Sequence, residues 1–103
     1  MWLQSSQMKY EIIFSPEAVN DFQHLKARDR SIIRDIIEEH LRQEPTKVSK
    51  SRIKRLKGTS RPQFRLRVSE FRIFYDVTET AVEILAIIPK LKASEWLKQE
   101  GNK

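Results

Sequence analysis

The sequence predicts an α+β domain with the element order β-α-α-β-β-β-α. Residues 32–41 repeat apolar side chains at helical spacing. Residues 63–75 alternate apolar and polar side chains, as half-buried strands do, and residues 81–88 form the nearly continuous apolar run of a strand covered on both faces. We therefore expect a four-stranded, mostly antiparallel sheet with an N-terminal helical hairpin on one face and a short C-terminal helix.

The first half of the chain supplies one strand and the helical hairpin. Residues 9–14 (KYEIIF) predict the strand. Ser15, Pro16 and Glu17 then provide a capping hydroxyl, a proline at the first helical position and an acid near the helix N-terminus. Asp29 is a candidate cap for the second helix, whose apolar stripe ends at Leu41.

The most informative stretch is the strand pair in residues 63–75. With Ser69 and Glu70 in the turn, Arg67 faces Arg72 directly, and Arg65 shares their face. Like charges that face each other destabilise a sheet. Guanidinium groups suit phosphate recognition, so we interpret the three arginines as a site for a polyanion, against the alternative that they protect an open sheet face from aggregation.

The positive charge is concentrated beside this hairpin. Residues 42–72 hold 11 basic and 2 acidic side chains, whereas the whole chain has a net charge of +6. Such a patch favours nucleic acid as a partner, although a solvated basic loop is the alternative. Residues 46–60 predict a long loop with a positive-φ turn at Gly58. The candidate nucleic-acid-binding residues in this region are Lys50, Arg52, Lys54, Arg55, Lys57 and Arg61.

Length and composition set the remaining expectations. The 103 residues predict one domain at 8–99, a flexible extension at 1–7 and a tail at 100–103, with Met1 or Met8 as the natural start. The chain has no cysteine, and His24 and His40 lie at no metal-ligand spacing with carboxylates, so we expect no metal and no cofactor. No membrane span or signal peptide is visible, which favours the cytoplasm.

Several motifs, in this order, resemble the RelE/ParE superfamily of bacterial toxins. They are YEIIFSP (residues 10–16), LKG (56–58), FRLRV (64–68), FRIFY (71–75) and VEILAI (82–87). The similarity runs from about Met8 to Leu97. It implies the fold expected above and a type II toxin that a cognate antitoxin holds inactive. RelE-like members cut messenger RNA in the ribosomal A site, while ParE-like members poison DNA gyrase.

The resemblance also implies catalytic positions. It places the two basic residues of one strand at Arg65 and Arg67, and the arginine of the next strand at Arg72. A basic position after the last strand is matched loosely by Lys90 or Lys92. The tyrosine that usually follows on the final helix is absent, and Trp96 is the aromatic residue in that segment.

The implied reaction is metal-free attack of an RNA 2′-hydroxyl on the neighbouring phosphorus. Arginines can stabilise the phosphorane but are poor bases, so the candidate bases are Lys90, Lys92, Lys54 and Lys57. Trp96 is either a platform for a base or a hydrophobic anchor of the last helix. Three functions remain open: a ribosome-dependent mRNA endonuclease, a gyrase inhibitor, and a non-catalytic binding module.

Overall fold

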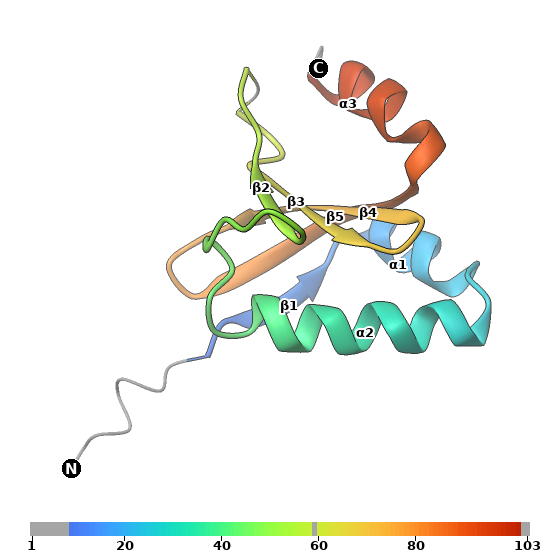
Figure 1. Ribbon diagram of the computed structural model, residues 1–103, viewed down its shortest axis with the longest axis horizontal. Coiled ribbons are helices and arrows are strands. Elements are labelled where there is room, and N and C mark those ends of the chain that lie inside the picture. The colour runs from blue at the N-terminus through green and yellow to red at the C-terminus, as the bar shows by residue number, and fades with distance from the viewer. Residues whose placement is uncertain (1–8, 59, 102–103) are drawn as a thin grey trace.

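The computed structural model describes residues 9–58 and 60–101, and the expected extension at 1–7 lies outside them. Five strands form one mixed sheet in the order β1-β5-β4-β3-β2 (Figure 1). Only β1 and β5 pair in parallel; the other neighbours are antiparallel. The strands are β1 (Glu11–Phe14), β2 (Ile53–Arg55), β3 (Phe64–Val68), β4 (Phe71–Val77) and β5 (Ala81–Pro89).

The helical hairpin forms as predicted, between β1 and β2, from α1 (Pro16–Gln23) and α2 (Ala27–Leu41). Ser15 is the N-cap of α1, and its hydroxyl accepts a hydrogen bond of 3.0 Å from the amide of Ala18. The predicted cap of α2 is wrong. Lys26 is its N-cap, without a side-chain hydrogen bond, and Asp29 lies in the first turn, where an acid still favours the helix dipole.

The predicted hairpin of β3 and β4 has the expected register. Arg67 pairs with Arg72, with Ser69 and Glu70 in the turn. Ser69 has a φ of 52°, and Gly58 has the predicted positive φ, 80°. The prediction of four strands was one short. It missed β2, which has only three residues, because a single apolar side chain, Ile53, gives no recognisable alternation.

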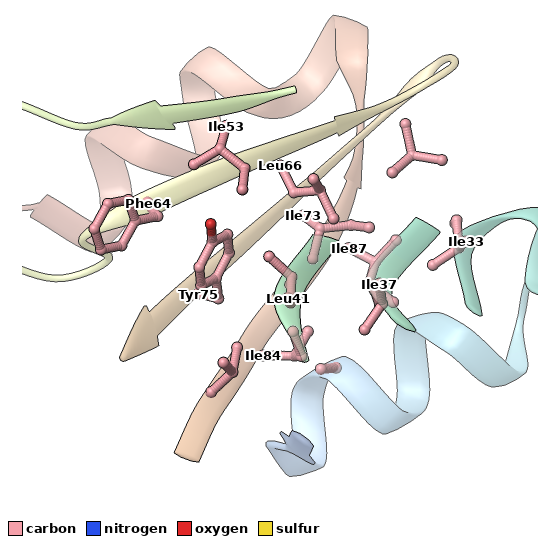
Figure 2. Close-up of a cluster of buried hydrophobic side chains, with 13 residues drawn as sticks. Ile33, Ile37, Leu41, Ile53, Phe64, Leu66, Ile73, Tyr75, Ile84 and Ile87 are labelled. Carbon is pink, nitrogen blue, oxygen red and sulfur yellow. The ribbon is translucent and has the colours of Figure 1, made fainter. Parts of the chain in front are cut away.

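The main core lies between the sheet and the helical hairpin (Figure 2). Ile33, Ile37 and Leu41 of α2 are buried against strand residues such as Leu66 and Ile84. Tyr75 is fully buried, and its hydroxyl donates to the carbonyl of Pro45 at 2.7 Å. This face of the sheet is therefore closed by apolar packing.

The opposite face of the sheet carries one helix, α3 (Ala93–Gly101), which follows a short 3₁₀ helix (Lys90–Lys92). It covers a smaller buried cluster of Phe74, Ala86 and Ile88. Within the described part of the chain, no helix has both the length and the apolar character that a membrane crossing requires.

Candidate nucleic-acid interface

Strand pairing places two pairs of like charges on the sheet face that bears α3, which we call the arginine face. Arg67 lies opposite Arg72 across β3 and β4. Lys54 lies opposite Arg65 across β2 and β3. Each such pair costs a sheet up to about 1 kcal/mol relative to neutral neighbours. Two of them side by side indicate that this surface is shaped by something other than its own stability.

A cavity of about 690 Å³ opens between the arginine face, the loop after β2 and α3. Among the described residues, six basic side chains and no acidic one line its wall. The lining residues are Lys54, Leu56, Lys57, Gly58, Arg65, Arg72, Phe74, Lys90, Ala93, Ser94, Leu97 and Lys98. A concave surface with one sign of charge and low-dielectric walls concentrates its field on an anionic ligand.

Arg65 lies at the centre of this arrangement and has an unsatisfied donor. Its Nε is buried and has no hydrogen-bond partner among the described residues. Burial lowers the pKa of the Arg65 guanidinium, and the positive charges of Arg72 and Arg67 lower it further. A buried donor without a partner is costly, and an anion in the cavity would relieve the repulsion between Arg65 and its two neighbours.

Arg72 is held more firmly than Arg65. Only 8% of it is exposed, and its Nη1 donates to the carbonyls of Ser69 at 3.0 Å and Phe71 at 2.9 Å. Burial lowers the pKa of Arg72, as does the charge of Arg67, while Glu70 acts in the opposite direction. The hairpin turn thus fixes one side of this guanidinium and leaves its charge facing the cavity.

Arg67 shares the face but does not line the cavity. Its side chain is exposed, and its influence on the site is the charge that it adds beside Arg65 and Arg72. Among the described residues, none of these three arginines forms an ion pair with a carboxylate. The structure therefore brings Arg65 and Arg72 together in the cavity and leaves Arg67 at its margin.

The two lysines expected after the last strand have different positions. Lys90 lines the cavity, whereas Lys92 is exposed and is not among the residues that line it. Lys98 of α3 also lines the cavity, and it was not predicted from the sequence. Its spacing of four residues from Ser94 was the available signal, since both lie on one side of a helix.

Trp96 anchors α3. Its ring stacks on Phe74 with centroids 4.8 Å apart and an interplanar angle of 15°. Its Nε1 donates to Oε2 of Glu17, at the start of α1, at 3.1 Å. Because both the ring face and the indole N–H are engaged within the chain, the anchor interpretation accounts for this residue.

Of the six residues predicted to bind nucleic acid, two line the cavity and four do not. Lys54 and Lys57 line the cavity. Arg52 donates from Nη1 to the carbonyl of Arg67 at 2.9 Å, Arg55 lies 5.1 Å from the ring centroid of Phe64, and Arg61 contacts Asp76 with an Nε–Oδ2 distance of 3.2 Å. Lys50 is exposed outside the cavity. Charge density in the sequence overstated how many of these side chains converge.

Neither histidine lies in the cavity. Nδ1 of His24 contacts the carbonyl of Asn20 at 2.8 Å, and Nε2 of His40 lies 3.5 Å from Oε2 of Glu39. In residues 9–58 and 60–101, no group of three or more histidine, cysteine, aspartate or glutamate side chains is placed to hold a metal ion. The chemistry available in the cavity is that of its arginines and lysines.

A small α+β domain with one cationic sheet face is the class of protein that this fold and site define. The model of the family described as the ParE toxin of the type II toxin–antitoxin system parDE matches residues 12–92, most of the chain. The chain therefore belongs to this family of type II toxins, within the RelE/ParE superfamily. The resemblance inferred from its sequence motifs is confirmed.

Solved toxin structures share the fold. A chain of the RelBE2 toxin–antitoxin complex from Mycobacterium tuberculosis is 24% identical, with a TM-score of 0.68 over 80% of this chain and 99% of that one. A chain of the RelE–RelB complex from Pyrococcus horikoshii is 26% identical, with a TM-score of 0.61 over 81% and 97%. A doubly substituted RelE from E. coli in the free state is 23% identical, with a TM-score of 0.65 over 88% and 93%. No curated protein sequence matches the chain.

Proposed function

We propose that this toxin is a ribosome-dependent endoribonuclease that cuts messenger RNA and thereby inhibits translation in the cytoplasm. The observation that carries the proposal is Arg65. Arg65 has a buried, unpartnered Nε and lines a cavity together with Arg72, and no carboxylate of the described residues lines that cavity. A phosphodiester offers the paired oxygens that such guanidinium groups bind best.

In the proposed reaction, an RNA 2′-oxygen attacks the adjacent phosphorus and the bond from phosphorus to the 5′-oxygen breaks. The products are a 2′,3′-cyclic phosphate and a free 5′-hydroxyl. Arg65 and Arg72 bind the non-bridging oxygens as charge develops on the phosphorane, and Arg67 adds its field. A lysine of the cavity, Lys90, Lys54 or Lys57, accepts the proton of the 2′-hydroxyl. Lys92, the other lysine expected after the last strand, does not line the cavity.

The cavity offers no evident acid to protonate the leaving oxygen, so water or the ribosome would supply that proton. Ribosomal RNA would also hold the messenger in a geometry suited to in-line attack. Such positioning can contribute several kcal/mol to lowering a barrier. The division of labour explains how a small chain with an incomplete catalytic set can act only where the substrate is already oriented.

A cognate antitoxin is the second proposed partner. Structural relatives of the chain were solved as toxin–antitoxin complexes from M. tuberculosis and P. horikoshii. By analogy with these relatives we expect an acidic, helix-forming protein encoded beside this chain, and its acidity would complement the positive charge of this surface. Co-expression with the neighbouring reading frame should give a complex that co-purifies and loses toxicity; free toxin in the presence of that product would contradict the assignment.

The proposal is tested by expressing the uninhibited toxin and mapping the 5′ ends of cellular mRNA. We expect cuts at fixed positions within codons, and their loss in Arg65→Ala. Arg28→Ala is the matched control, since it removes the same charge from the exposed surface of α2. Absence of cuts from the wild-type protein, or cuts that persist in Arg65→Ala, would contradict it.

Inhibition of DNA gyrase is the second candidate function. The matching family is described as ParE, and α3 lacks the tyrosine usual in RelE-like toxins. The same cells should then accumulate gyrase-cleaved DNA without mRNA cuts. If expression is harmless and neither signal appears, a non-catalytic binding module is the remaining function.

A further inference from the structure

The cavity contains more positive charge than a short length of RNA can balance. Six basic side chains line it: Lys54, Lys57, Arg65, Arg72, Lys90 and Lys98. Among the described residues, no carboxylate lines it and none of the six forms an ion pair. Elsewhere on the surface, Arg42 pairs with Glu38 and Lys47 with Glu44.

The volume limits which anion can provide the missing charge. About 690 Å³ falls within the range of roughly 300–1,000 Å³ that is typical of small-molecule sites. A phosphodiester chain carries a single charge per nucleotide, and each charge comes with a sugar and a base that occupy space. A chain of linked phosphates carries several charges in the same volume, so it matches the six cations better.

One wall of the cavity is apolar. Leu56, Phe74, Ala93 and Leu97 form this wall, beside the hydroxyl of Ser94. Inorganic polyphosphate would leave this wall in contact with water. A ligand with a nucleoside at one end would cover it, because a nucleobase has a large apolar face and a few polar atoms at its edge.

From the charge, the volume and the apolar wall, we infer that this cavity binds a free nucleoside polyphosphate. The phosphates lie between Arg65, Lys57 and Lys98, and the nucleoside lies against Leu56 and Leu97. This inference uses the cavity of the proposed function but does not depend on RNA cleavage. Bound nucleotide would compete with RNA for Arg65, so the nucleotide would regulate the toxin.

The test is calorimetric titration of the toxin, purified free of antitoxin, with ATP, AMP, adenosine and inorganic triphosphate. Divalent cations are left out because they neutralise phosphates. We expect ATP to bind about tenfold or more tightly than AMP, inorganic triphosphate to bind more weakly than ATP, and adenosine not to bind. Equal affinities for ATP and AMP would overturn the charge argument. Equal affinities for ATP and inorganic triphosphate would overturn the nucleoside assignment.

Lys98→Ala provides the variant arm, because Lys98 is an exposed residue whose loss should leave the fold intact. We expect its affinity for ATP to fall about three- to tenfold. Lys47→Ala removes the same charge at a site paired with Glu44 and should bind ATP like the wild-type protein. Equal losses in the two variants would indicate a non-specific charge effect and overturn the site.

The two proposals fail separately, because the titration contains no RNA and the 5′-end mapping does not measure nucleotide binding. Binding without mRNA cuts would leave the cavity as a nucleotide site and remove the endonuclease. Cuts without ATP binding would leave the endonuclease and remove the nucleotide site. If both hold, ATP should slow cleavage in a reconstituted translation system in proportion to its occupancy of the cavity.

Discussion

The two faces of the sheet are built from the same strands but have opposite character. In β3, Leu66 is fully buried beneath α2, while its neighbour Arg67 is exposed on the other side. In β4, Ile73 belongs to the main core, while Arg72 is buried with its charge toward the cavity. Alternation along a strand thus separates the residues that stabilise the fold from those that repel one another. Stability and function are divided residue by residue, and substitutions at neighbouring positions can test this division.

The largest expected effect is a loss of stability, and it is expected on the sheet face that α1 and α2 cover. Leu66→Ala should lower the free energy of unfolding by about 2–5 kcal/mol, because it removes a fully buried side chain and leaves a cavity. Arg67→Ala, one residue away, should change stability by less than about 1 kcal/mol, and in the stabilising direction, since it removes a like charge opposite Arg72. Urea denaturation measures both. Similar losses in the two variants would show that the faces are not energetically separate.

The next effect is on activity without loss of stability. Arg65→Ala should reduce mRNA cleavage about 10²–10³-fold, the usual cost of losing one donor that stabilises developing charge. Its free energy of unfolding should stay the same or rise, because the guanidinium is half-buried with an unpartnered Nε. Cleavage is assayed on ribosomes and stability by urea. A variant that is both inactive and destabilised would place Arg65 among the structural residues.

A smaller effect is expected where α3 meets the arginine face. Trp96→Ala should lower stability by about 1–2 kcal/mol, because it removes the stack on Phe74 and the hydrogen bond to Glu17. Trp96→Phe keeps a ring and should recover most of that loss. Hydrogen exchange of the α3 amides should accelerate in Trp96→Ala only. Unchanged exchange with lost cleavage would instead favour a base-stacking role.

The smallest effect concerns a charge pair at the C-terminal end of α2. Arg42 donates to Glu38 with an Nε–Oε1 distance of 3.0 Å, and this hydrogen bond lowers the pKa of the Glu38 carboxyl. The pair therefore stabilises the folded state above the unfolded pKa of Glu38 and loses this contribution as the pH falls through the lower, folded value. Glu38→Gln should flatten the acid limb of a plot of stability against pH. No difference between pH 3 and 6 would contradict this.

The sequence was sufficient where a periodic pattern determines the geometry. The register of β3 and β4 followed from alternation on both sides of a two-residue turn, so the opposition of Arg67 and Arg72 could be predicted. Ser15 was recognisable as a cap because its side chain acts on the next few residues. Local patterns of this kind need no knowledge of the rest of the chain.

The missed features depend on contacts between distant segments. The edge strand β2 exists because it pairs with β3, and its three residues carry no signal of their own. Lys98 enters the cavity because Trp96, which is 22 residues from Phe74 in the chain, sets the position of α3. Arg55 and Arg61 have the same composition signal as Lys57 but contact Phe64 and Asp76 instead. The sequence alone did not reveal these partners.

The segment that leads into α3 is hydrogen-bonded to the turn between β3 and β4. The backbone amide of Lys90 donates to the carbonyl of Glu70 at 2.7 Å, in the same turn that Arg72 clasps. The backbone of Lys90 is thus held by the hairpin turn. Lys98 lies two turns further along the chain, and its position depends on how Trp96 packs α3 against the sheet. A partner protein that moved α3 away from the sheet would widen the cavity and remove Lys98 from it, while Arg65 and Arg72 would stay in place on their strands.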